Sequence, residues 1–439
     1  MHARSAPSCT LAALPLLGLL LGLTSVAPTA AGEIGSGIFV GGFVSQGYLN
    51  SEDNDYLLPN GREGSGAFNE AAVIVSAEPA DRVRVGIQFM GRDFGSSQAS
   101  AVRVDWAYGD YRWRDQLGLR AGRIKLPYGL YNEERDVDML RTSVLLPQSV
   151  YSESDRNLLL AYEGVGLYGN LVLGDFGDLD YELVLGSLNI PEDGNDDAAR
   201  LIESLAADFA PAVAADVAGT YGLAADSVSA SPASVVGAEL AVPRVYGGGL
   251  IWNTPLSGLR VGGTWLAGDV EARGRARYDV FLRTGGQIPA YLPRDFEISG
   301  ELDLEHVYTV SAEFHRGHFT AASEYSRLNI QGEVSDGWYA LADYRFSPRL
   351  AAQTYWATGY LDADDRDGAK LEAGGLPDYY AWQHDLALAL RVDINDFWLV
   401  KFEYHHMNGA ALSRLDLLDA GETASERWRV WTAKTTFHF

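Results

Sequence analysis

Residues 382–408 read WQHDLALALRVDINDFWLVKFEYHHMN, and apolar and polar side chains alternate along most of this stretch. Every second residue from Leu386 to Leu390 is apolar, and Phe402 and Tyr404 alternate with charged or polar neighbours further on. Side chains of a β-strand point alternately to two sides, so a period of two predicts strands with one apolar and one polar face. We therefore expect residue 388 to face an apolar phase and residue 387 to face water.

The same alternation recurs along the chain from Gly37 onward, in segments of about ten to fourteen residues. It predicts sixteen strands, at 37–49, 66–78, 82–91, 101–112, 116–124, 157–173, 178–188, 243–254, 258–268, 300–315, 318–331, 336–346, 349–361, 380–393, 396–408 and 427–439.

The links between these strands are alternately short and long. Brief links such as 79–81, 113–115 and 347–348 stand between longer ones such as 125–156 and 189–242. Tight turns at one end and long loops at the other are typical of an outer-membrane barrel. A soluble sandwich or propeller would also alternate, but its loops would not sort by end. We predict an all-β fold, a transmembrane antiparallel β-barrel of about 16 strands with short periplasmic turns and long extracellular loops.

Composition and the first residues set the compartment. A short start with Arg4, the apolar run Leu11–Ala27 and small residues up to Ala31 predict a secretory signal peptide over 1–31, followed by the barrel over 32–439. An uncleaved anchor is the alternative, but the run is short for the ~20 residues of a spanning helix. The net charge of −25 excludes a nucleic-acid partner.

The segment 125–156, KLPYGLYNEERDVDMLRTSVLLPQSVYSESDR, is too apolar for a loop surrounded by water. A barrel of sixteen strands is wide enough for an aqueous channel. We therefore expect this third external loop to fold inward and narrow the channel. Its charged residues are the candidate constriction: Lys125, Glu133, Glu134, Arg135, Asp136, Asp138 and Arg141.

The stretch AGRIKLPYGLYNEERDV, residues 121–137, resembles the corresponding stretch of sixteen-stranded Gram-negative porins related to the phosphate-selective porins. The resemblance implies a water-filled channel for passive diffusion of small hydrophilic solutes or ions, built as a homotrimer in outer-membrane lipid and lipopolysaccharide. Phosphate selectivity in that family rests on dense lysine and arginine, whereas this loop mixes both signs of charge.

Lumen-facing wall residues show the same mixture of charges. Opposite charges across a narrow slot give a transverse field that orders polar solutes; the alternative is that they are solvated wall residues at different heights. The candidates on the wall are Arg84, Arg103, Arg120, Glu313 and Asp385.

The last strand, WRVWTAKTTFHF, resembles the C-terminal motif that the barrel-insertion machinery reads, with Phe437 and Phe439 on one face. In the loop 189–242, a helical face runs until Pro211 and is formed by Ala198, Ile202, Leu205 and Phe209. It predicts a short helix lying on the external loops, with a plug of the channel mouth or a contact with a neighbouring subunit as the alternatives. The acidic segment 362–368 is expected to be a solvated loop, with loose Ca²⁺ binding as the alternative.

Function classes other than a channel have less support. The histidines are scattered over several strands, and no recognisable nucleophile turn or metal-binding spacing accompanies them. We predict no enzymatic activity, no cofactor and no metal site. An adhesive or receptor barrel acting through its external loops, and less so an outer-membrane hydrolase, are the alternatives.

Overall fold

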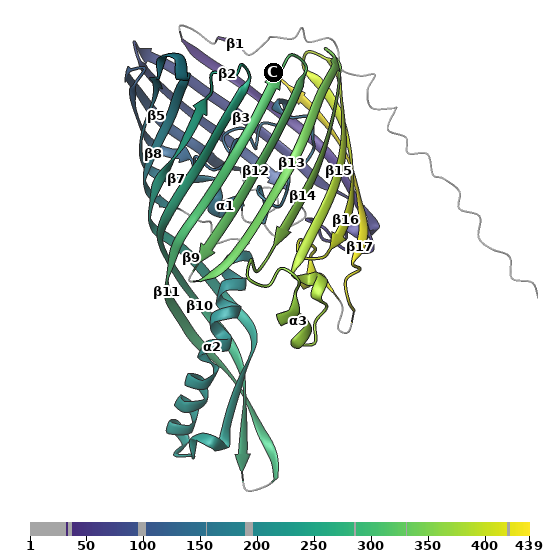
Figure 1. The fold of residues 1–439 in the computed structure, drawn as a ribbon. Helices are drawn as coiled ribbons and strands as arrows, with labels where there is room; N and C mark the ends of the chain where they lie inside the picture. The colour runs from purple at the N-terminus through teal and green to yellow at the C-terminus, as the bar shows by residue number, and fades with distance from the viewer. Residues whose placement is uncertain are drawn as a thin grey trace, which may run out of the picture.

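The computed structural model describes residues 32–33, 37–94, 102–154, 156–188, 196–284, 287–330, 332–418 and 422–439. The predicted signal peptide, 1–31, lies outside them. Sixteen strands, β2 to β17, form one closed antiparallel barrel, and the short β1 (Gly32–Glu33) pairs with β2 (Figure 1). The predicted barrel and its strand number are confirmed.

The strand bounds follow the predicted segments closely except in the middle of the chain. They are β2 Ile38–Glu52, β3 Ser65–Ala80, β4 Val83–Asp93, β5 Val102–Arg114, β6 Leu117–Lys125, β7 Ala161–Val172, β8 Asp178–Leu188, β9 Val228–Asn253, β10 Leu259–Thr284, β11 Gln287–Arg316, β12 Phe319–Ile330, β13 Glu333–Ser347, β14 Leu350–Tyr360, β15 Trp382–Asn395, β16 Trp398–Gly409 and β17 Arg427–His438.

Closure comes from the pairing of the last strand with the first strand of the barrel. β17 pairs with β2 from Arg429↔Glu52 to His438↔Phe43, and the backbone of Phe439 adds two hydrogen bonds to Gly42. A closed sheet leaves no strand edge with unpaired backbone groups, which is what a barrel in hydrocarbon requires. Among the described residues, no helix is long and apolar enough to cross a membrane.

Three strands continue far beyond the barrel, where the sequence predicted loops. β9, β10 and β11 extend over 228–243, 268–284 and 287–304, and with the helix α2 (Asp196–Tyr221) they form an arm that projects from the long-loop end (Figure 1). The predicted loops 189–242 and 269–299 are therefore wrong in part, because the strand pairing continues without a break of more than a bulge.

The helix α2 also runs past Pro211, where the sequence predicted its end. Ile202 and Ala206 before the proline and Val213 and Val217 after it are all buried, in one apolar cluster with strand residues of the arm. Packing on both sides outweighs the one helical hydrogen bond that proline removes. The helix lies on the arm and not on the loops of the barrel mouth.

The two faces of the wall differ as the alternation predicts. Leu388 is 51% exposed on the outer face, whereas its neighbour Ala387 points inward. Ala387 is buried, because the loop between β6 and β7 fills much of the lumen next to it. The expectation that residue 387 meets water is wrong for that reason. We call this loop, residues 126–160, loop 3; it contains the 3-10 turn η2 (Asp138–Leu140) and the short helix α1 (Arg156–Leu159).

Candidate pore constriction

Loop 3 is attached to the wall at its 3-10 turn η2 by buried charges. The Lys401 ammonium on β16 donates to the Asp138 carboxylate (3.1 Å) and to the Ser143 carbonyl (3.0 Å), and both charged side chains are fully buried. On β17, Lys434 lies 3.1 Å from the same carboxylate and the Thr436 hydroxyl donates to it at 2.6 Å. Buried charges are tolerated only when they are paired and hydrogen-bonded, so these contacts fix η2 in one position against β16 and β17.

A second ion cluster holds the two ends of loop 3 to β5. Arg156 donates to Asp136 (2.6 Å) within the loop and to Asp105 (2.9 Å) on the wall, and Lys125 contacts both carboxylates. All four side chains are at least nine-tenths buried.

Nearby, Arg92 on β4 bridges Glu70 of the wall and Glu153 of the loop.

A third attachment lies on β12. The Glu324 carboxylate accepts hydrogen bonds from the Leu130 backbone N–H (2.7 Å) and from the hydroxyls of Tyr151 and Tyr339. The loop approaches closely here because Gly129 has φ +61° and no side chain, and a Cβ would collide with the Tyr151 hydroxyl. Glycine is the residue that allows both the backbone angle and the approach.

A fourth attachment involves Glu403 and His405 on β16 and Asp385 on the neighbouring strand β15. The Glu403 carboxylate accepts the backbone N–H groups of Val144 and Leu145 in loop 3. Between Glu403 and Asp385 lies the buried ring of His405, with Nε2 2.8 Å from the former and Nδ1 3.0 Å from the latter. The two carboxylates and the imidazole are thus buried together under the loop.

These attachments decide the protonation of the loop's carboxylates. Burial alone would raise the pKa of Glu153, but Arg92, Arg135 and Arg156 outweigh it and lower that pKa to about 2. The pKa of Asp138 lies below its ordinary value by the same balance, with Lys401 and Lys434 overcoming burial. Glu153 and Asp138 are therefore ionised at neutral pH.

Most wall partners of these contacts lie on β12–β17 and β2–β4; Asp105 lies on β5, and Lys125 is the last residue of β6. We call β12–β17 with β2–β4 the attached arc, and β6–β10 the open arc; β5 and β11 border both. Between loop 3 and the open arc lies a cavity of about 620 Å³. Its lining includes residues 126–130 and 132–134 of the loop and, on the wall, Arg112, Arg120, Tyr168, Asp180, Glu182, Ile251 and Arg260.

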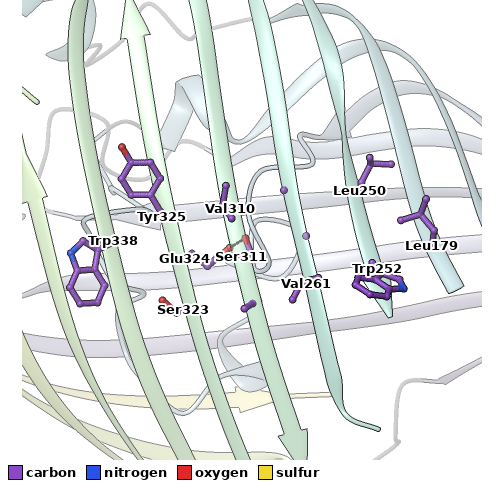
Figure 2. Close-up of a pocket in the computed structure, with 13 residues that line it drawn as sticks. Leu179, Leu250, Trp252, Val261, Val310, Ser311, Ser323, Glu324, Tyr325 and Trp338 are labelled. Atoms are coloured by element: carbon purple, nitrogen blue, oxygen red, sulfur yellow. Dashed lines mark hydrogen bonds between the residues drawn. The ribbon is translucent and has the colours of Figure 1, made fainter. Parts of the chain in front are cut away.

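A larger hollow, of about 750 Å³, lies over β8–β13 and is lined mainly by apolar side chains of the outer face, among them Leu250, Trp252, Val310 and Trp338 (Figure 2). Of its lining, Ser311 and Glu324 face inward and share a hydrogen bond of 2.6 Å. An apolar hollow on the lipid side does not offer a path for hydrophilic solutes. The inner cavity is the candidate site.

The structure divides the predicted charges of loop 3 into two groups. Glu133 and Glu134 are exposed and line the inner cavity. The other predicted charges of the loop and its start are held in contacts with the wall or within the loop: Lys125, Arg135, Asp136, Asp138 and Arg141.

The five predicted wall residues are also separated. Arg120 and Glu313 lie at the cavity, Arg120 3.6 Å from Glu133 and Glu313 2.9 Å from the Tyr131 hydroxyl of the loop. Asp385 is buried with His405 in the attached arc. Arg84 pairs in register with Asp110, and Arg103 with Met90, so neither joins the cavity lining.

Several wall residues of the cavity were not predicted from the sequence. Arg260 bonds Glu313 at 2.9 Å, Glu182 lies 3.7 Å from Arg120, and Asp178 and Asp180 both accept from the side-chain amide of Asn170. Each stands at an inward position of its strand, so the alternation places them in the lumen. It cannot show that they face the part of the lumen that loop 3 leaves open.

The remaining predicted sites lie away from the cavity. Phe437 and Phe439 are about half exposed, as the predicted assembly motif needs, and that role stays a prediction. In the segment 362–368, Asp362 bonds Lys370, and Arg366 bonds Asp336. Among the described residues, no group of three acidic, histidine or cysteine side chains is placed to hold a metal ion.

Solved structures of outer-membrane porins share this fold. Against OmpF of Salmonella typhi, solved with daunomycin, the TM-score is 0.50 at 11% identity, covering 92% of this chain and 97% of that one. The outer-membrane channel DcaP of Acinetobacter baumannii (TM-score 0.48, 11% identity, 93% and 100% covered) and the anion-selective porin of Comamonas acidovorans (0.48, 10%, 92% and 99%) are also similar. At such identities the likeness to OmpF establishes the fold alone. No protein-family model and no curated protein matches the chain.

Proposed function

We propose that this protein is a porin of the bacterial outer membrane, which lets small hydrophilic solutes or ions diffuse between loop 3 and the open arc. The observation that carries the proposal is the polar cavity of about 620 Å³ inside a closed barrel, bordered by a loop that is attached on the other side. A loop held by buried ion pairs cannot swing away, so it defines a fixed opening.

The proposal includes the setting that the sequence predicts. The short turns face the periplasm, a signal peptide directs export, and the barrel is inserted by the barrel-assembly machinery into outer-membrane lipid and lipopolysaccharide as a homotrimer. The relation to the phosphate-selective porins is part of the proposal and rests on residues 121–137. The barrel has no enzymatic role in it.

The arm favours one further candidate, an adhesive or receptor role through the external end. Its helix α2 covers one face of the three extended strands, and the other face presents the side chains of Arg273, Arg275 and Arg277 along β10. A barrel that acted only through the arm would not conduct ions, so the conductance of the purified protein separates the two functions.

The test uses two residues of neighbouring strands that point to opposite sides. Ile251 on β9 lines the cavity, and Leu183 on β8, which is not in the cavity lining, is 51% exposed on the outer face. In planar bilayers, Ile251→Trp should lower the single-channel conductance of the purified protein, because the larger ring occupies the passage, whereas Leu183→Trp should leave it unchanged. A wild-type protein without channels, or equal conductance of both variants, contradicts the proposal.

A further inference from the structure

The charges around the inner cavity are unequal, although those of loop 3 and the wall are mixed when taken as a whole. In the part of the chain that the structure describes, the charged residues that line the cavity, or that bond a charged or amide side chain of its lining, are three arginines and eight carboxylates. The arginines are Arg112, Arg120 and Arg260; the carboxylates are Asp110, Asp115, Glu133, Glu134, Asp178, Asp180, Glu182 and Glu313.

The loop side of the cavity is purely acidic. Among the described residues of loop 3, the charged side chains that lie exposed are Glu133 and Glu134. The loop's arginines are used elsewhere: Arg135 donates to the backbone carbonyls of Tyr151 and Ser152, and Arg141 to that of Val144. Arg135 and Arg141 thus bind backbone carbonyls of the loop, and the charged side chains that remain at the cavity are Glu133 and Glu134.

On the wall side, two of the three arginines, Arg120 and Arg260, already bond carboxylates. Arg120 bonds Asp110 at 3.0 Å and lies 3.6 Å from Glu133 and 3.7 Å from Glu182, so one guanidinium faces three carboxylates. Its ring neighbour Tyr168 lies 4.4 Å away and fixes its plane.

The second wall arginine, Arg260, bonds Glu313 at 2.9 Å. Arg84 adds one positive charge opposite Asp110 and does not reverse the balance.

A further acidic pair stands on β8 towards the short-turn end. Asp178 and Asp180 share one face of the strand, and both accept hydrogen bonds from the amides of Asn170 and Asn253 at 2.7 to 2.8 Å. Amide donors hold the two carboxylates in place without neutralising them. A solute that has passed Glu133 and Glu134 therefore meets negative charge again.

We infer that the passage prefers cationic solutes, including small organic cations with amine or guanidinium groups, because its loop face exposes carboxylates alone and its wall arginines are outnumbered by their partners. The inference rests on the proposed channel function. Low-dielectric walls focus such an excess of charge, and the screening length of about 8 Å at physiological ionic strength lets it act across a narrow passage.

The experiment is the reversal potential of the full-length mature protein in a planar bilayer under a KCl gradient. The wild type should prefer K⁺ over Cl⁻. Glu133→Gln combined with Glu134→Gln should lower that permeability ratio by about twofold or more, because the loop face becomes neutral. Glu239→Gln is the matched control, since this exposed residue lies on the arm, and it should leave the ratio unchanged.

Solute entry into liposomes gives a second readout, with lysine expected to enter faster than glutamate through the wild type. Channels with no preference or with anion preference overturn the inference and leave the proposed channel intact, whereas absence of channels overturns both. If the double variant does not fold, Asp178→Asn combined with Asp180→Asn tests the same point, and an unchanged permeability ratio in that variant also overturns the inference.

Discussion

The attached arc and the open arc are built from the same kind of strand, yet their inward residues do different work. In the attached arc, charges such as Lys401 and Glu403 are fully buried against loop 3. In the open arc, charges such as Arg120 and Asp180 line a cavity. An inward charge in a barrel is therefore a pore residue only where no loop covers it. Three predictions test the difference.

The largest effect is expected at the seat of η2. Asp138→Asn leaves the buried ammonium groups of Lys401 and Lys434 without their shared carboxylate, which should cost about 3–5 kcal/mol of folding free energy. Glu133→Gln, in the same loop but exposed, should change it by less than about 0.5 kcal/mol. Unfolding of the detergent-solubilised protein, followed by heat-dependent gel mobility and circular dichroism, measures both.

The same pair of variants has a functional readout. Single-channel currents of Asp138→Asn should be larger or noisier than those of the wild type, because η2 is no longer held against β16 and β17. Equal stability and equal current noise in the two variants would contradict the division into an attached and an open arc.

A somewhat smaller contrast is expected for new charges at inward positions. Ala387→Arg places a cation in the apolar packing under loop 3 and should lower stability by about 2–4 kcal/mol. Ile251→Arg points into the cavity of the open arc, meets water and carboxylates, and should be tolerated. Comparable amounts of heat-modifiable protein for both variants would mean that residue 387 is hydrated.

The smallest effect is expected from pH. The pKa of Glu153 is lowered to about 2 from 4.5, so the stability that it adds is present above pH 4.5 and is lost as the pH falls towards 2. Burial raises the pKa of Glu134, with Arg260 opposing it, so Glu134 loses its charge at a higher pH than Glu153 does.

On acidification, the cation preference of the channel should therefore weaken before loop 3 loosens. Reversal potential and current noise, recorded on the same bilayer from pH 7 to pH 3, give the order of the two events. A rise in noise before any change in ion preference would contradict the assignment of Glu153 to the attachment and of Glu134 to the passage.

The barrel could be predicted from the sequence alone, because strand period and alternating link lengths are local properties. Residues 382–408 show one apolar and one polar face, and the structure forms the two strands β15 and β16 from them. The sequence also indicated that loop 3 needs a surface, since a loop rich in leucine and valine is not stable in water alone.

The position of loop 3 and the charges that remain at the passage follow from long-range contacts in the folded protein. Glu134 and Arg135 are neighbours in the sequence, but one is exposed at the cavity and the other is buried among backbone carbonyls. That choice depends on distant partners: Arg135 donates to the carbonyl of Tyr151, 16 residues away, and the loop itself is held by Lys401, 263 residues from its partner Asp138. A period of two assigns a side of the wall, and it carries no information about what covers that side.

The arm is a second part of the fold that local sequence patterns did not predict. Residues 269–299 were predicted as a long link between two strands, and β10 and β11 pair through most of this segment because each strand continues the register set inside the barrel. Pairing that has already begun extends at little further entropic cost, so a segment of weak local preference becomes strand. Long-range pairing, which no local pattern encodes, made that decision.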